Sequence, residues 1–187
     1  MGELKGKDEN VPVPVVTIIG RSGSGKTTLM EALIPELSGR GYRVATIKHH
    51  SHSGFEVDQP GKDSWRYARA GSVQVIIAAP DKIASYRPLE AELTLPEILQ
   101  EVHEADLVLV EGYKHAGYPT LEVLRSAIGM ELIAGPEQRF AVAVDTPLDL
   151  GIPCFDPGDI SGIADLIEER FLTRPETLPW GSIRPFA

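Results

Sequence analysis

The chain has 187 residues, of which 42% are hydrophobic, and it carries a formal net charge of −9 at pH 7. This length suits one α/β domain with a sizeable core, and the acidity argues against a general nucleic-acid-binding surface. The single cysteine, Cys154, excludes an internal disulfide and a cysteine-based metal site. Together with the missing signal peptide it favours a cytoplasmic protein, and no apolar run reaches the roughly 18 residues of a membrane span.

The first predicted elements are a strand and a helix. Residues 1–10 are polar and are expected to form a mobile tail, after which the apolar run Val13–Ile19 predicts a strand. Residues 27–39 predict a helix that ends near Arg40. Its apolar side chains recur at a spacing of 3.6 residues, which gives it one buried face: Leu29, Met30, Leu33, Ile34 and Leu37.

The loop between this strand and helix matches the pattern G-x-x-x-x-G-K-[ST] of phosphate-binding loops. It reads Gly20-Arg21-Ser22-Gly23-Ser24-Gly25-Lys26-Thr27, and Thr28 follows. Glycines let backbone N–H groups wrap a phosphate chain, and the first helical turn offers unpaired N–H groups and the positive end of the helix dipole. Lys26 is placed to reach the β- and γ-phosphates, and the Thr27 hydroxyl to bind Mg²⁺. The alternative is a glycine-rich turn without a ligand, to which the Lys-Thr pair would add nothing.

A polar loop with three histidines, His49, His50 and His52, follows a second predicted strand, Arg43–Lys48. Loops after the strands of an open α/β sheet gather on one edge, so we expect this loop near the phosphate loop. The histidines could bind a transition metal, but neither cysteine nor H-x-x-x-H spacing accompanies them; contacts to a ligand or plain solvation are the alternatives. Asp58 is the better candidate, as a carboxylate near Mg²⁺ or a water, the alternative being an exposed loop residue.

Four short elements are predicted next. Residues 63–70 indicate a helix in which Trp65 packs into the core. Strands at 73–78 and 83–86 are expected to pair as a hairpin across Pro80-Asp81. Residues 95–102 predict a helix that Thr94 caps.

The stretch Asp106–Gly112 contains four consecutive aliphatic residues and ends in an acid and a glycine. This pattern predicts a buried parallel strand that resembles a Walker B strand. A carboxylate at such a strand end can hold Mg²⁺ or orient the attacking water, and Glu111 occupies that place. The alternative is that Glu111 only hydrogen-bonds neighbouring loops. Tyr113-Lys114-His115 follow and could close over a ligand.

Residues 120–124 and 141–144 predict two further strands, and the second again ends in an acid, Asp145. Asp145 could accept hydrogen bonds from the guanine N1–H and 2-amino groups, but it also begins an ordinary strand-to-turn sequence. A strand at 152–155 and a helix to about Leu172, capped by Asp159 or Ser161, complete a predicted domain over residues 11–172. Residues 173–187 are expected to form an extended tail.

Four segments carry a family resemblance: GRSGSGKTTL, TIKHHSHSGFEVDQPGKDSWRYARAG, LVLVEGYKHAGYPTLEVLR and AVAVD. In this order they resemble MobB-type molybdopterin-guanine dinucleotide biosynthesis proteins. Many nucleotide-binding proteins share the phosphate loop, whereas the His-rich segment and EGYK are more particular. The resemblance implies a P-loop NTPase three-layer α/β/α fold of the SIMIBI class, with a mostly parallel central sheet and some antiparallel strands.

The resemblance also implies a homodimeric GTP-binding protein with slow GTPase activity. Such proteins are thought to assist MobA, the guanylyltransferase that joins molybdopterin to GMP, so molybdopterin or its guanine dinucleotide is an implied ligand. Carried over to this chain, GTP would bind at Gly20–Thr28, with Asp58 and Glu111 near Mg²⁺ and acting with Lys26 in catalysis.

Two departures from the pattern limit this carry-over. Arg21 stands where the loop of this class often has a lysine. That Arg21 delivers a positive charge across a dimer is therefore a hypothesis only. No N-K-x-D sequence is present, so no motif fixes the guanine preference.

Two other functions stay open. A P-loop kinase would use Asp58 as base, but an arginine-rich lid is missing. A nucleotide-binding adaptor without turnover would have nearly the same sequence as a slow GTPase.

Overall fold

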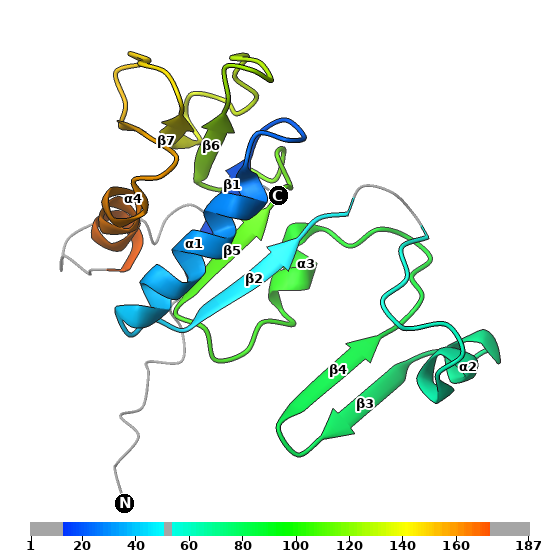
Figure 1. Ribbon diagram of the computed structural model, residues 1–187. Helices are drawn as coiled ribbons and strands as arrows, with labels where there is room; N and C mark the ends of the chain where they lie inside the picture. Colours follow the sequence, from blue (N-terminus) through cyan, green and yellow to red (C-terminus); the bar gives the residue numbers. More distant parts are fainter. Residues whose placement is uncertain (1–12, 51–53, 173–187) are drawn as a thin grey trace, which may run out of the picture. The chain divides into compact units, whose positions relative to one another are not determined.

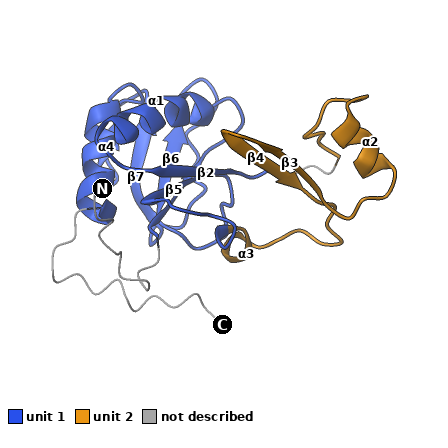
Figure 2. Cartoon of the chain, turned by 90° about the horizontal axis from the view of Figure 1, so that it is seen from below, with its two compact units in different colours: residues 1–49, 99–187 blue, residues 50–98 orange. Residues whose placement is uncertain are grey.

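The computed structural model describes residues 13–50 and 54–172 (Figure 1). The chain divides into two compact units: residues 1–49 with 99–187 form the first, and residues 50–98 form the second (Figure 2). The sequence did not indicate this division of the predicted domain. The predictions for residues 1–10, His52 and residues 173–187 lie outside the described residues.

A six-stranded parallel sheet in the order β2-β5-β1-β6-β7-β8 forms the centre of the first unit (Figure 1). Its central strands are aliphatic runs buried on both faces, as is usual in parallel sheets. All six strands were predicted. β8 is shorter than the predicted 152–155 because Pro153 has no N–H for the sheet. The strands are β1 (Val15–Ile19), β2 (Val44–Lys48), β5 (Leu107–Glu111), β6 (Thr120–Leu124), β7 (Arg139–Val144) and β8 (Cys154–Phe155).

Two helices, α1 (Lys26–Gly39) and α4 (Ile160–Ile167), cover one face of this sheet (Figure 2). The apolar stripe predicted for α1 is confirmed, because Leu29 and Leu33 are buried against alternate residues of the strands. The predicted cap of α4 is also confirmed: the Asp159 carboxylate accepts a hydrogen bond from the Gly162 backbone N–H at 3.0 Å. A π-helical turn, η1 (Glu168–Leu172), continues α4 to the predicted end.

Loop residues pack on the opposite face of the sheet at β6 and β7. A second apolar cluster there consists of the buried residues Leu124, Val142 and Val144. Partly buried residues pack against it: Leu132, Leu148, Leu150, Ile152 and Cys154. Beside this cluster Glu122 is fully buried and forms an ion pair with Arg139 at 2.8 Å. The predicted fold class, a mostly parallel α/β sheet of the P-loop NTPase type, is confirmed.

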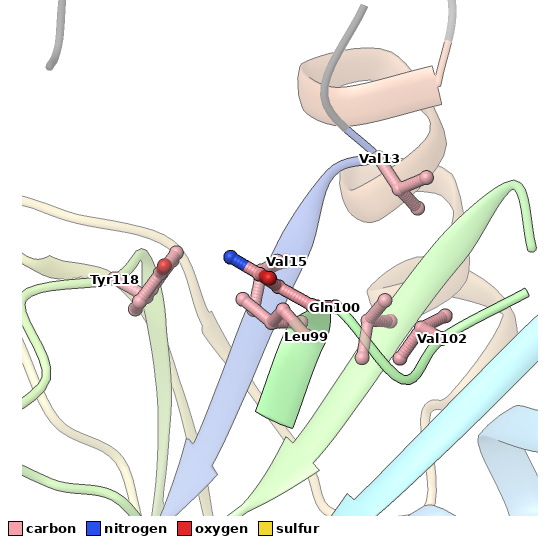
Figure 3. A pocket seen from close by; sticks show the side chains of 7 residues that line it. Val13, Val15, Leu99, Gln100, Val102 and Tyr118 are labelled. Atoms are coloured by element: carbon pink, nitrogen blue, oxygen red, sulfur yellow. The ribbon is translucent and has the colours of Figure 1, made fainter. Parts of the chain in front are cut away.

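An apolar pocket lies at the amino-terminal ends of β1 and β5 (Figure 3). Val15 and Val108 are paired there in the first register position of the two strands, whereas the phosphate loop follows the last residue of β1. The pocket therefore lies at the wrong end of the sheet to be the predicted site. Its lining residues are Val13, Val15, Leu99, Gln100, Val102, Val108 and Tyr118.

The second unit contains α2 (Asp63–Arg69), β3 (Val75–Ala79), β4 (Lys82–Tyr86) and most of α3 (Leu95–Leu99). β3 and β4 pair in antiparallel fashion, as predicted, with Ala79 opposite Lys82 at the turn. At the start of α3 the Thr94 backbone N–H donates to the Glu97 carboxylate at 2.8 Å, which is the half of a capping box that the Glu97 side chain supplies; the cap by the Thr94 side chain stays a prediction. α3 ends three residues earlier than predicted. No described helix is long and apolar enough to cross a membrane.

The prediction that Trp65 packs into the core is wrong. Among the described residues of the second unit only Val75 and Leu95 are buried, so this unit has no core large enough to enclose an indole. Trp65 is partly exposed, and the Arg69 guanidinium lies 5.3 Å from its ring centre.

Candidate phosphate-binding site

The predicted phosphate loop joins the carboxyl end of β1 to the start of α1, and two of its glycines are required for different reasons. A Cβ atom at Gly20 would overlap the Val123 carbonyl oxygen of β6 and stand 2.6 Å from Ser24 Oγ. Gly25, the N-cap of α1, has φ = +101°, a conformation that side chains rarely adopt. No described side chain caps α1, so its first N–H groups remain available to an anion.

Lys26 folds back over this loop. Its Nζ donates to the carbonyl oxygens of Gly20 at 3.0 Å and Arg21 at 2.8 Å. Partial burial lowers the pKa of Lys26; the negative charge of Glu111 opposes this shift and the positive charge of Lys48 adds to it. The carbonyl oxygens of the loop therefore hold the Lys26 ammonium beside the phosphate loop. Its positive charge would attract an anionic ligand bound there.

Ser24, inside the loop, has a buried hydroxyl without a hydrogen-bond partner among the described residues. A buried polar atom without a partner is uncommon in folded proteins and calls for an explanation. A ligand or a water inside the glycine loop would provide the missing hydrogen bond.

Glu111, at the carboxyl end of β5, meets the start of α1. The Thr27 hydroxyl donates to Glu111 Oε2 at 3.3 Å, and Lys48 Nζ, at the end of β2, lies 3.5 Å from the same oxygen. The Glu111 side chain is 14% exposed. A hydroxyl and a carboxylate oxygen this close are suitable ligands for Mg²⁺, directly or through its waters. The residues present therefore fit the predicted ion, although no described group of three or more His, Cys, Asp or Glu side chains gathers at one point.

Lys48 was missed by the sequence analysis. It stands opposite Glu111 in the register of β2 and β5. These strands are separated in the chain by the whole second unit, so their pairing could not be inferred from local patterns. The only available sign was that Lys48 ends a predicted strand, as Glu111 does.

Asp145, directly after β7, is held by the turn that follows β6. It accepts hydrogen bonds from the Ser126 backbone N–H at 2.8 Å and from the Ser126 hydroxyl at 3.1 Å. The backbone N–H of Ser126 is the main cause that lowers the pKa of Asp145, and the charge of Arg125 contributes further. The carboxylate is thus fixed and ionised at the same sheet edge as the phosphate loop. Its contact with guanine stays a prediction.

The loop 125–131 after β6 packs over the phosphate loop, a contact that the sequence analysis did not anticipate. Arg21 forms an ion pair with Glu131 of this loop. A Cβ atom at Gly23 would lie 3.6 Å from Ile128 Cδ1, and one at Gly25 would lie 3.6 Å from Arg125 Nη2. Arg21 thus has an acidic partner within its own chain.

Asp58 belongs to the second unit. Its carboxylate accepts hydrogen bonds from the Tyr86 hydroxyl at 2.8 Å and from the Gln59 backbone N–H at 2.7 Å. Interactions with Ser64 and then Tyr86 lower the pKa of Asp58. The role of Asp58 near Mg²⁺ stays a prediction.

His49 packs on the turn that follows Glu111. Its ring stacks on Tyr113 with the centroids 4.4 Å apart, and a Cβ atom at Gly112 would stand 2.8 Å from His49 Cβ. Gly112 has φ = +103° and Tyr113 has φ = +51°. This glycine is therefore needed both for the turn and for the close approach of His49. His50, in the second unit, stacks on Phe55.

The fold and the site together define a class of protein. A glycine loop leads from the central strand of a parallel α/β sheet into a helix, with a lysine at the loop and a carboxylate on the neighbouring strand. This is the architecture of P-loop NTPases. Over residues 15–146 the chain matches the family "Molybdopterin guanine dinucleotide synthesis protein B", MobB, and it belongs to this family. The identification made from sequence is confirmed.

Relatives and solved structures agree with this assignment. The chain is 42% identical over 161 residues to a "Molybdopterin-guanine dinucleotide biosynthesis adapter protein" of Haemophilus influenzae, covering 85% of this chain and 90% of that protein. It is 37% identical over 163 residues to the protein of the same name in Escherichia coli, covering 84% and 93%. It also superimposes on a crystal structure of "molybdopterin-guanine biosynthesis protein B (mobB)" with a TM-score of 0.64 at 31% identity, covering 83% and 98%.

Proposed function

We propose that this protein binds GTP with Mg²⁺, hydrolyses it slowly, and acts as an adapter in molybdopterin-guanine dinucleotide assembly. Two relatives are named adapter proteins of that biosynthesis. Its partners would be a MobA-type guanylyltransferase and molybdopterin or its guanine dinucleotide. The observation that carries the proposal is the meeting of Lys26, Thr27 and Glu111 at an uncapped helix N-terminus.

The chain's own groups would share the work of holding the triphosphate. Backbone N–H groups of the glycine loop and of the first turn of α1 would bind phosphate oxygens. Lys26 would bind the β- and γ-phosphates, and because two of its three N–H donors are now used on carbonyl oxygens of the loop, at least one of these hydrogen bonds would be exchanged for a phosphate contact. Thr27 and Glu111 would hold Mg²⁺, which neutralises charge on the phosphates when bound.

Slow turnover fits the environment of Glu111. Hydrolysis of a nucleoside triphosphate requires a group that orients the attacking water. Glu111 Oε2 already accepts a hydrogen bond from Thr27 and lies close to Lys48, so this carboxylate is less free to orient a water. Asp58 is the second candidate for that role. Such an arrangement suits a protein whose bound nucleotide serves as a signal to a partner.

A homodimer through the β3–β4 hairpin is part of this proposal. Ile76 and Ile83 are 58% and 72% exposed and lie on the same face of the hairpin, whereas Ile77, 43% exposed, lies on the other face. An isolated two-stranded sheet is marginally stable in water, and exposed apolar side chains on strands mark interaction surfaces. A second copy of the hairpin offers a self-complementary surface of the same chemistry.

The test is equilibrium binding of GTP in the presence of Mg²⁺, with the wild type, Lys26→Ala and the control Lys62→Ala. Loss of a charge-assisted phosphate contact costs about 1.5–3 kcal/mol, or roughly ten- to more than a hundredfold in affinity. We expect this loss for Lys26→Ala and none for Lys62→Ala, an exposed lysine of the second unit. Unchanged GTP affinity in folded Lys26→Ala protein would disprove the assigned site.

Single-turnover hydrolysis, with and without a MobA-type enzyme and molybdopterin, separates the three candidate activities. A slow GTPase forms GDP at a measurable rate that the partner alters. A pure adaptor keeps GTP intact in both conditions. A kinase forms GDP only when a small acceptor molecule is added, and the acceptor gains the phosphoryl group.

A further inference from the structure

We propose that Arg125 is a second cationic contact of the bound nucleotide, holding its α- and β-phosphates from the side of the phosphate loop that faces away from Glu111. This inference rests on the proposed nucleotide site. It concerns a residue that neither the loop motif nor the strand-end acids indicate.

The alternation of side chains along β6 directs Arg125 toward the phosphate loop. Leu121 and Val123 of this strand belong to the same buried cluster as Leu29 and Leu33 of α1. Arg125 is two residues beyond Val123, so it lies on the same face of the sheet, just past the strand end where α1 begins. The position of its Nη2, 3.6 Å from a Cβ built on Gly25, places the guanidinium at the N-cap of α1.

The charge of the Arg125 guanidinium acts on the nearby Asp145 carboxylate without forming an ion pair with it. Arg125 forms no ion pair with any residue that the structure describes. The nearby carboxylate of Asp145 takes its hydrogen bonds from Ser126 instead. The five N–H donors of an arginine match the oxygens of phosphate groups, and such contacts are among the stronger hydrogen bonds in proteins.

The order of the strands indicates which phosphates Arg125 meets. The strands β5, β1, β6 and β7 follow one another in the sheet (Figure 1). At their carboxyl ends lie, in the same order, Glu111, the phosphate loop, Arg125 and Asp145. A nucleotide with its terminal phosphate beside Glu111 and its base beside Asp145 passes β6 with the phosphates closest to the ribose. Arg125 therefore meets the α- and β-phosphates.

The backbone at Arg125 is fixed, so its side chain projects from a rigid point. The N–H groups of Ile128 and Gly129 both donate to the Arg125 carbonyl oxygen at 2.9 Å. The same loop is fastened to the phosphate loop by the ion pair of Arg21 with Glu131. A fixed base reduces the entropy lost when the guanidinium binds an anion.

The experiment compares Arg125→Gln and Arg125→Lys with Arg66→Gln, which removes one exposed arginine of the second unit. Dissociation constants are measured for GTP, GDP and guanosine in the presence of Mg²⁺. Arg125→Gln should weaken GTP and GDP about tenfold or more, and to the same extent, because both share the α- and β-phosphates. Arg125→Lys should recover part of this loss. Guanosine affinity should not change, and Arg66→Gln should match the wild type.

Three results would overturn the inference. GTP and GDP affinities of Arg125→Gln equal to the wild type, with Lys26→Ala still defective, would show that Arg125 makes no phosphate contact while the proposed site stands. A loss confined to GTP would place Arg125 at the γ-phosphate. An equal loss for guanosine would show that Arg125 acts only through the fold or through Asp145. A wild-type protein that binds none of these ligands would instead refute the proposed function.

Discussion

Replacing Gly20 by alanine should destabilise the first unit strongly. The added methyl group would overlap the Val123 carbonyl oxygen, which belongs to the neighbouring central strand and cannot turn away as a flexible side chain can. Forcing an extra carbon into a packed site costs about 1–3 kcal/mol. The backbone at Gly20, with φ = +155°, adds about 1–3 kcal/mol for a residue with a side chain. The expected loss of unfolding free energy is about 2–6 kcal/mol from these two terms.

Two further glycines serve as matched controls for Gly20→Ala. Gly25 also has a positive φ, but a methyl group there would meet only Arg125 Nη2, at an ordinary contact distance of 3.6 Å. Gly25→Ala should therefore cost the backbone term alone, about 1–3 kcal/mol. Gly39 lies in α1 with nothing within 4 Å of an added methyl group, so Gly39→Ala should be neutral or stabilise by up to about 1 kcal/mol.

Urea denaturation followed by circular dichroism measures all three variants on one scale. The expected order of stability is Gly39→Ala, then Gly25→Ala, then Gly20→Ala, and the last is expected to unfold at much lower urea. A Gly20→Ala protein whose unfolding free energy is within about 1 kcal/mol of the wild-type value would show that the backbone of β6 moves away at Val123. The close contact would then not be the reason why a glycine is required at position 20.

Three further predictions concern the acids and the hairpin. Glu111→Gln should weaken the Mg²⁺ dependence of GTP binding, whereas Asp58→Asn should slow hydrolysis while GTP binding is kept. If the Mg²⁺ titration of GTP binding and the rate of hydrolysis are unaltered in both variants, these two acids are structural. Asp145→Asn should reduce the preference for GTP over ATP by about 1–3 kcal/mol, because a carboxylate oxygen that accepts from guanine becomes an amide N–H that faces a guanine donor. The preference is measured by competition binding of the two nucleotides. A variant that keeps the full preference would show that guanine is recognised elsewhere. Hydrogen bonds hold the pKa of this carboxylate below its usual range, so the wild-type preference should be flat from about pH 8 to about pH 5 and be lost only as the pH falls through that lowered pKa. Ile83→Asp should convert the proposed dimer to a monomer in light scattering, whereas Leu89→Asp, outside the hairpin, should not; an unchanged mass for both would exclude this surface.

Local patterns predicted the elements that carry the site. A buried strand, a glycine loop and an apolar stripe at helical spacing each leave a mark over a few residues, so β1, the phosphate loop and α1 could be placed from the sequence. The acid after a long aliphatic run marked Glu111 in the same way. Trp65 shows where this approach fails, because a large aromatic side chain indicates burial only if the unit around it has a core.

Contacts between distant segments could not be predicted in this way. Lys48 reaches Glu111 only because β2 pairs with β5, and Arg21 meets Glu131 only because β6 lies beside β1. Neither strand order nor loop course leaves a local pattern. The division into two units leaves no local pattern either, since the apolar strands of the hairpin look like core strands in sequence, although most of their residues are exposed in the structure.

The loop after β6 joins the two ends of the proposed nucleotide site, which the sequence presented as unrelated. Two consecutive residues supply both contacts: Arg125 lies beside the N-cap of α1, and Ser126 holds Asp145. A change in the position of this loop would therefore move a phosphate contact and the proposed base contact together. Because Glu131 of the same loop pairs with Arg21, an anion that attracted Arg21 would also weaken the fastening of this loop. If nucleotide binding moved Arg21, the occupancy of the phosphate loop and the geometry of the proposed base site would be coupled through this one short segment, and the protein would present a different surface with and without nucleotide.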